Sequence, residues 1–183
     1  MILIGLGANL SSQQFGPPRA TLGAALERLQ THGIEISRRS PWYRSAPVPV
    51  SDQPWYVNGV ASVTTRLSAD DLLETLLLIE AGMGRVRSEP NAPRILDLDL
   101  LAYNQLSIDK TTVGGVHVAV PHPRMTDRSF VMLPLADIAP TWRHPTLPMS
   151  LTEFIQALPS DQSTEPMADA SGIFGTEWRI PEN

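Results

Sequence analysis

Residues 84–103 read GRVRSEPNAPRILDLDLLAY, and this stretch decides how the rest of the chain is interpreted. Its second half, residues 95–103, is short and mostly apolar, which predicts a strand. Successive side chains of a strand point to opposite faces. We therefore expect Asp97 and Asp99 on one face of this strand and the leucines beside them on the other.

Two neighbouring carboxylates repel each other, and ionising both is costly unless a cation lies beside them. Mg2+ prefers hard oxygen ligands, and it uses one or two protein carboxylates together with water and substrate phosphate. Arg85, Arg87 and Arg94 lie just upstream, and arginine makes forked contacts with phosphate oxygens. The combination predicts a nucleotide-triphosphate site. The alternative from these residues alone is a pair of solvated carboxylates beside an ordinary helix end.

Composition narrows the classes of function. The chain has 183 residues, a length that favours one domain, and its net charge of -5 argues against a general nucleic-acid binder. It contains no cysteine, which excludes disulfides, a thiol nucleophile and a cysteine-based zinc site. The first residues do not resemble a signal peptide, and no apolar run approaches the ~18 residues of a membrane span. We expect a soluble cytoplasmic protein.

Hydrophobic periodicity and turn residues predict the order of the elements. The expected strands cover residues 2–6, 34–43, 56–66, 95–103 and 116–120, and the expected helices cover 18–33, 68–84, 130–138 and 150–158. Gly5 and Gly7 are expected in a turn after the first strand. The order strand, helix, strand, strand, helix, strand is the split βαβ pattern of ferredoxin-like α+β domains. It predicts an antiparallel sheet with helices packed on it and with the first and last strands of this unit at its centre.

Other segments and side chains each allow a structural and a functional interpretation. Residues 43–56 contain three prolines and three aromatic residues, so they form either a rigid connector or a wall with stacking faces for a planar ligand. Asn58 shares a strand face with Tyr56, and it is either a satisfied buried amide or a donor and acceptor for the edge of a heterocycle. His117 and His122 lack a third nitrogen or sulfur ligand nearby, which favours hydrogen bonding over metal binding.

Several motifs, taken together, resemble the 6-hydroxymethyl-7,8-dihydropterin pyrophosphokinase family. The matching motifs are Leu6-Gly7-Ala8-Asn9-Leu10, Tyr43-Arg44-Ser45, Tyr56-Val57-Asn58, Gly84-Arg85-Val86-Arg87, Pro93-Arg94-Ile95-Leu96-Asp97-Leu98-Asp99, Pro121-His122 and Arg128-Ser129-Phe130. The Pro-Arg-x-x-Asp-x-Asp block followed by Pro-His is highly specific. The resemblance covers residues 1–158, so it divides the chain into a pyrophosphokinase domain and a C-terminal extension, residues 159–183, which we expect to be loosely docked.

The resemblance implies transfer of the terminal pyrophosphate of ATP to the hydroxymethyl group of the pterin, with release of AMP and two Mg2+ ions held by Asp97 and Asp99. The implied catalytic residues are Arg85, Arg94, Asp97 and Asp99. The implied ATP-binding residues are Glu80, Arg87, Leu100, His117, His122 and Arg128. The implied pterin-binding residues are Ser45, Ala46, Val48, Tyr56, Asn58, Asp97 and Phe130. ATP and the pterin are the expected partners of a monomer or weak homodimer, with neither nucleic acid nor membrane.

The chain departs from the family pattern in the loop of residues 84–94, which we call the arginine loop. The pattern has an Arg-Trp pair before the Pro-Arg motif, whereas this loop is one residue shorter and reads Pro90-Asn91-Ala92. His117 and Ala119 stand where the pattern has arginine and threonine, and Pro123 replaces an aromatic residue. The arginine loop is expected to close over both substrates and exclude water.

Other functions explain fewer of these residues. A nucleotide-sugar glycosyltransferase also uses an Asp-x-Asp motif, but it would normally need a larger nucleotide-binding domain. A non-enzymatic ferredoxin-like binding module explains the fold and leaves the clustered acids and arginines unexplained. The chain lacks the Gly-x-x-x-x-Gly-Lys-Ser/Thr motif of P-loop kinases.

Overall fold

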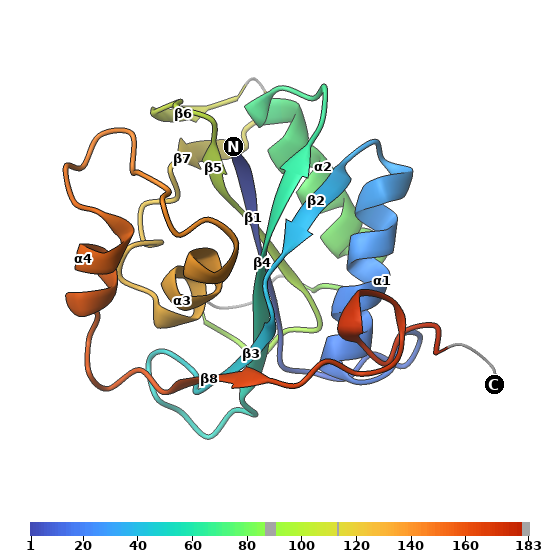
Figure 1. Ribbon diagram of the computed structural model, residues 1–183. Coiled ribbons are helices and arrows are strands. Elements are labelled where there is room, and N and C mark those ends of the chain that lie inside the picture. Colours follow the sequence, from blue (N-terminus) through green and yellow to red (C-terminus); the bar gives the residue numbers. More distant parts are fainter. Residues whose placement is uncertain (87–90, 113, 181–183) are drawn as a thin grey trace.

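A computed structural model of the chain describes residues 1–86, 91–112 and 114–180. Within these residues, the main sheet has strands in the order β5-β1-β4-β3-β8, and β2 also pairs with β4 (Figure 1). All of these pairings are antiparallel. The strands are β1 (Ile2–Ala8), β2 (Glu35–Arg39), β3 (Trp42–Ser45), β4 (Tyr56–Thr64), β5 (Asp97–Tyr103) and β8 (Thr164–Met167).

Helices cover both faces of the sheet (Figure 1). Helices α1 (Pro18–Thr31) and α2 (Ala69–Gly82) pack on one face, and α3 (Ser129–Ile138) and α4 (Leu151–Gln156) lie on the other side. A separate hairpin pairs β6 (Ile108–Thr111) with β7 (His117–Val120), and a short 3-10 turn, η1, covers Ile173–Gly175. Among the described residues, no helix is long and apolar enough to cross a membrane.

The expected ferredoxin-like α+β order is confirmed, with one error in strand placement. The sheet is antiparallel, and the split βαβ unit runs from β1 to β5. The prediction that the first and last strands of this unit lie at the centre is wrong for the last one. β1 and β4 are central, whereas β5 pairs with β1 on one side and ends the strand order. The edge position leaves β5 accessible to side chains from the loops around it.

Two local expectations are also wrong. The strand expected over residues 34–43 is divided into β2 and β3 by Ser40 and Pro41, because proline has no N–H to continue the ladder. Ser40 instead bonds across to Val60, with its N–H donating to the Val60 carbonyl at 2.9 Å and its Oγ accepting the Val60 N–H at 3.0 Å. Gly5 and Gly7 lie inside β1 and pair with β4 and β5.

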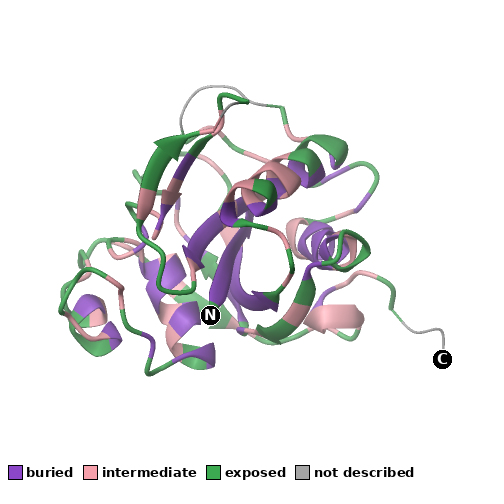
Figure 2. Ribbon diagram, turned by 90° about the horizontal axis from the view of Figure 1, so that it is seen from above, coloured by how far each residue is buried: buried purple, intermediate pink, exposed green. Residues whose placement is uncertain are grey.

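The two faces of the sheet build two apolar clusters, which appear as the buried interior in Figure 2. Alternation along β1 sends Ile4 and Leu6 toward α1 and α2, and Leu3 toward α3. Leu98 of β5 packs with the α1–α2 cluster. Asp97 and Asp99 therefore face the α3 side together, as their spacing predicts.

Residues beyond 158 contact the rest of the chain at several places. β8 pairs with β3, so it extends the sheet by one strand. Trp178 packs against the α1–α2 cluster, its ring centroid lies 5.7 Å from that of Phe15, and Glu177 forms an ion pair with Arg19 of α1. The division of the chain at residue 158 stays a prediction.

Candidate active site

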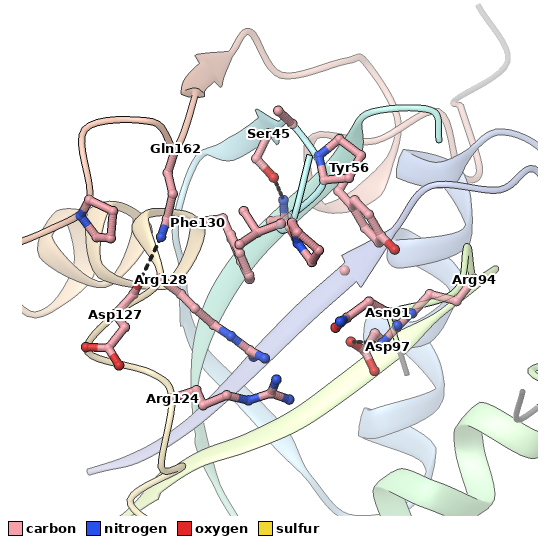
Figure 3. Close-up of a pocket in the computed structure, with 17 residues that line it drawn as sticks. Ser45, Tyr56, Asn91, Arg94, Asp97, Arg124, Asp127, Arg128, Phe130 and Gln162 are labelled. Atoms are coloured by element: carbon pink, nitrogen blue, oxygen red, sulfur yellow. Dashed lines mark hydrogen bonds and ion pairs between the residues drawn. The ribbon is translucent and has the colours of Figure 1, made fainter. Parts of the chain in front are cut away.

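A cavity of about 340 Å³ opens on the α3 side of the sheet (Figure 3). Its floor and walls come from β1, β3, β4, β5, the loop after β3 and the start of α3. We call it the first cavity. Its lining residues are Gly7, Ser45, Ala46, Pro47, Val48, Pro49, Tyr56, Asn58, Asn91, Arg94, Asp97, Arg124, Asp127, Arg128, Phe130, Pro159 and Gln162.

One wall of the first cavity carries a buried amide beside an aromatic ring. Asn58 of β4 is 5% exposed, and its Nδ2 donates to the Oγ of Ser45 at 2.8 Å. The side chains of Tyr56 and Asn58 share a face because they alternate along β4. Gly7 lies opposite, where an added Cβ would come within 3.1 Å of the Asn58 Oδ1. A larger residue at position 7 would therefore push on the amide, so glycine keeps this floor open.

An acid–arginine cluster closes one end of the first cavity. Arg85 forms ion pairs with both Glu80 and Asp97, and Arg94 pairs with Asp97 at 2.9 Å. The guanidinium of Arg128 lies 3.5 Å from Asp99. Arginines thus compensate the charge of both carboxylates on β5, as neighbouring acidic groups require.

Glu80 is the buried acid of this cluster, with 2% of its surface exposed. Its Oε1 accepts the backbone N–H of Leu98 at 2.7 Å, and its carboxylate pairs with Arg85. The end of α2 is thereby joined to β5 between the two aspartates. Glu80 therefore lies beneath the cluster and helps to fix the positions of its charged groups, through the ion pair with Arg85 and the hydrogen bond to β5.

The environment of Asp99 makes its carboxyl group harder to ionise than usual. Burial, followed by the neighbouring charge of Asp97, raises the pKa of Asp99 to about 6, although Arg128, Arg85 and Arg94 act in the opposite direction. The carboxylate form is therefore the form that a bound cation would stabilise.

A second cavity of about 260 Å³ lies on the other side of Asp99. Leu100, His117 and His122 line it, as does Arg124, which also lines the first cavity. Burial, followed by the charges of Arg128 and Arg124, lowers the pKa of His122 to about 4. His122 is therefore neutral at neutral pH and suited to hydrogen bonding. His117 is exposed, and its Nε2 lies 3.4 Å from Asp109.

The residues predicted from the sequence gather around these two cavities. Ser45, Ala46, Val48, Tyr56, Asn58, Arg94, Asp97, Arg128 and Phe130 line the first cavity. Asp99, Leu100, His117 and His122 line the second. Glu80 and Arg85 join through ion pairs at the end of α2. Arg87 lies outside the described residues, together with residues 88–90 of the arginine loop that is expected to close over the site.

Several lining residues were missed by sequence reasoning. Arg124 lies two residues after His122 of the Pro-His motif, and its position there was the available signal. Its side chain and that of Arg128 extend toward Asp97 and Arg94 on the opposite side (Figure 3). Asp127 and Gln162 had no comparable signal, because Gln162 belongs to a polar segment that was expected to dock loosely.

A second missed group ties the loop after β3 to the loop before β5. The Nδ2 of Asn9 donates to the Pro54 carbonyl at 3.0 Å, and its Oδ1 accepts the N–H of Arg94 at 2.8 Å. The Nε2 of Gln53 donates to the Asn91 carbonyl at 2.9 Å. Asn9 therefore fixes the main chain of Arg94 against the wall of the first cavity.

Asp97 and Asp99 form the candidate metal centre. The described residues contain no group of three or more His, Cys, Asp or Glu side chains arranged to hold a metal ion. An ion bound by two aspartates would need further oxygens from water and substrate. That ligand set fits Mg2+, which keeps several waters and shares phosphate oxygens with its substrate.

Comparisons with known proteins identify the family of the chain. The family model described as 7,8-dihydro-6-hydroxymethylpterin-pyrophosphokinase matches residues 3–140. A 2-amino-4-hydroxy-6-hydroxymethyldihydropteridine pyrophosphokinase from Synechocystis sp. is 39% identical over 155 residues, which cover 84% of this chain and 74% of that protein. A protein of the same name from Pseudomonas aeruginosa is 41% identical over 148 residues, which cover 79% of this chain and 83% of that one.

A solved structure also shares the fold. The Plasmodium falciparum protein described as HPPK-DHPS superposes with a TM-score of 0.67 at 13% identity, covering 85% of this chain and 44% of that one. This chain therefore spans less than half of that protein. Because the family model covers most of the chain, the chain belongs to the 7,8-dihydro-6-hydroxymethylpterin-pyrophosphokinase family.

Proposed function

We propose that the protein transfers pyrophosphate from ATP to the hydroxymethyl group of 6-hydroxymethyl-7,8-dihydropterin and releases AMP. Family membership supports the reaction class and the acceptor. The observation that supports a magnesium–ATP donor is the acid–arginine cluster between two cavities, one for each substrate.

The first cavity suits the pterin. Its size fits a small bicyclic ring, and the rings of Tyr56 and Phe130 provide flat apolar surfaces for stacking. Asn58 and Ser45 provide the polar groups that can pair with the edge of a heterocycle. Ala46 and Val48 complete the wall of the loop after β3, where contacts can also come from the backbone.

The second cavity suits the adenosine part of ATP. Leu100 provides an apolar contact, and the neutral His122 can donate or accept one hydrogen bond. His117 stands at the rim. Arg87 would reach the phosphates from the arginine loop.

Asp97 and Asp99 would hold the magnesium ions that accompany the triphosphate. When bound, Mg2+ would neutralise phosphate oxygens and favour departure of AMP. Two ions are proposed, because each aspartate faces a different cavity along the strand. Arg85, Arg94 and Arg128 would then bind phosphate oxygens in place of the aspartate oxygens.

The chain's own residues orient the reactants and compensate charge. The walls of the first cavity would direct the pterin hydroxyl toward the β-phosphorus, and the arginines would bind the oxygens around it. The hydroxyl oxygen would form the new bond to the β-phosphorus and release its proton to solvent, while the bond from that phosphorus to the bridging oxygen of AMP would break. This transfer requires positioning and electrostatic stabilisation and no covalent enzyme intermediate.

Product analysis tests the proposal directly. Purified protein incubated with Mg2+, ATP and the reduced pterin should form AMP and the pterin diphosphate. Chelation of Mg2+ should stop the reaction. Formation of ADP in place of AMP would exclude pyrophosphate transfer. The cytoplasmic location, the monomeric or weakly dimeric state and the absence of nucleic-acid or membrane partners stay predictions.

A further inference from the structure

The polar segment after α4 reaches the first cavity through Gln162 (Figure 3). This residue lies outside residues 3–140, which the family model matches. Its side chain bonds the main chain on both sides of Arg128. Its Nε2 donates to the Asp127 carbonyl at 2.8 Å, and its Oε1 accepts the N–H of Ser129 at 2.8 Å. One amide thus holds the two peptide groups that flank Arg128.

These bonds compensate for an unusual start of α3. Arg128 occupies the N-cap position, where Ser, Thr, Asp or Asn would normally accept a hydrogen bond from the first turn. A guanidinium has no acceptor and cannot do this. The first N–H groups of a helix still need acceptors. Gln162, 33 residues away in sequence, provides one for Ser129.

The next two residues bind the opposite wall. The N–H of Ala46 donates to the Ser163 carbonyl at 3.1 Å. The hydroxyl of Thr164 lies 2.6 Å from the hydroxyl of Ser129, and Thr164 pairs with Ser45 in the ladder between β8 and β3. Residues 162–164 therefore connect the start of α3 with the loop after β3. Each of these segments forms one wall of the first cavity: the start of α3 contributes Phe130, and the loop after β3 contributes Ala46.

We propose that Gln162 is a positioning residue for the pterin, acting through the main chain of residues 127–129. The proposal rests on the proposed function. The backbone of α3 sets the position of the Phe130 ring, so a shift of the helix start moves this wall. The Arg128 guanidinium is held separately near Asp99 at 3.5 Å, and its long side chain can follow a small shift. Among the described residues, 162–164 are not part of the second cavity's lining.

Steady-state kinetics with both substrates test the proposal. Gln162→Ala should raise the KM for the pterin by roughly tenfold, because two hydrogen bonds are lost, and should leave the KM for ATP within about twofold. The matched control is Glu177→Gln, which weakens another contact of the same C-terminal segment, the ion pair with Arg19, and neither of these residues lines a cavity described above. The control should leave both KM values unchanged.

A purely structural role would give a different result. Equal rises of both KM values, or an unchanged KM for the pterin, would overturn the proposal. The wild-type protein in the same assay reports on the proposed function. If it forms no AMP, both the function and the inference are wrong, whereas an active wild type with an unaffected Gln162→Ala variant refutes the inference alone.

Two further measurements apply if Gln162→Ala folds poorly. Gln162→Glu keeps the acceptor for Ser129 and removes the donor to Asp127, so it should raise the pterin KM by a smaller factor. Amide hydrogen exchange at Ser129 should be faster in Gln162→Ala than in Glu177→Gln, and it should stay slow in Gln162→Glu, which keeps the acceptor. Exchange at Ser129 that is unchanged in Gln162→Ala, or an unchanged pterin KM in Gln162→Glu, would contradict the proposal.

Discussion

The two faces of the central sheet differ in what their residues contact. The face toward α1 and α2 is apolar along its length, with Ile4, Leu6 and Leu98 buried among helix side chains. The opposite face packs on α3 in its middle, but at one end it presents Asn58 and Asp97 to a cavity. Both faces come from the same strands, so alternation of side chains separates the residues that stabilise the fold from those that bind substrate.

The comparison predicts its largest effect at the acid–arginine cluster. Asp97→Ala should reduce kcat/KM by about a thousandfold, or ~4 kcal/mol of transition-state stabilisation, because a magnesium ligand is lost, Arg94 loses its ion-pair partner and Arg85 keeps only Glu80. Asp99→Ala should act in the same direction. Steady-state kinetics measure both, and Asp70→Ala, which removes the half-buried partner of Lys110, is the control. Near-normal turnover of either variant would remove that aspartate from the metal site.

On the face toward α1 and α2, a substitution should change the stability of the fold and leave substrate binding unchanged. Leu76 of α2 is fully buried against the sheet, and Leu76→Ala should reduce the free energy of unfolding by about 3 kcal/mol through lost burial and a residual cavity. The variant should keep its KM values while it is folded. Urea denaturation and kinetics at low temperature measure the two quantities. A raised KM for either substrate with unchanged stability would contradict the separation of the two faces.

This separation also explains which features could be predicted from the sequence. The alternation of aspartates and leucines in β5 is local, so their two faces follow from the sequence alone. The edge position of β5 depends on pairing with distant strands, and the wrong expectation of a central place arose there. β8 contains Pro166, and proline in a short polar segment reads as a loop, although an edge strand tolerates it.

In the site, too, contacts between residues close in sequence could be predicted, and contacts between distant residues could not. Asp97, Arg94 and Arg85 lie close together in sequence, and motif spacing was enough to group them. Gln162 contacts the chain 33 to 35 residues earlier, and a single polar residue carries no periodicity that would indicate this contact. Asn9 had no predicted role beyond its place in the Leu6–Leu10 motif, whereas it anchors the main chain of Arg94 across 85 residues.

A smaller effect is expected at the wall of the first cavity. Asn58→Ala should weaken pterin binding by about 2 kcal/mol, roughly thirtyfold, because the amide that faces the ring edge is removed. Ser45 also loses its partner at 2.8 Å. ATP binding should be unchanged. Calorimetric titration with each substrate measures this, and an unchanged pterin affinity would remove Asn58 from the site.

The smallest effect concerns pH. The pKa of Asp99 is raised to about 6, so protons should compete with Mg2+ below that pH, and the apparent Mg2+ affinity should fall by about fivefold between pH 6 and pH 5. In the metal-free protein, the free energy of unfolding should change with pH in the opposite direction to the Mg2+ affinity. The raised pKa stabilises the folded state at low pH, and this contribution is lost as the pH rises from about 4 through 6. Thermal unfolding with and without Mg2+ measures both trends, and Asp99→Asn should abolish them.

Counting bound ions tests the central claim most directly. Mn2+ is titrated into the protein with an unreactive ATP analogue, and bound ions are measured by electron paramagnetic resonance. The account predicts two ions per wild-type chain and their loss when both Asp97→Asn and Asp99→Asn are introduced. The same number of bound ions in this double variant as in the wild type would contradict it.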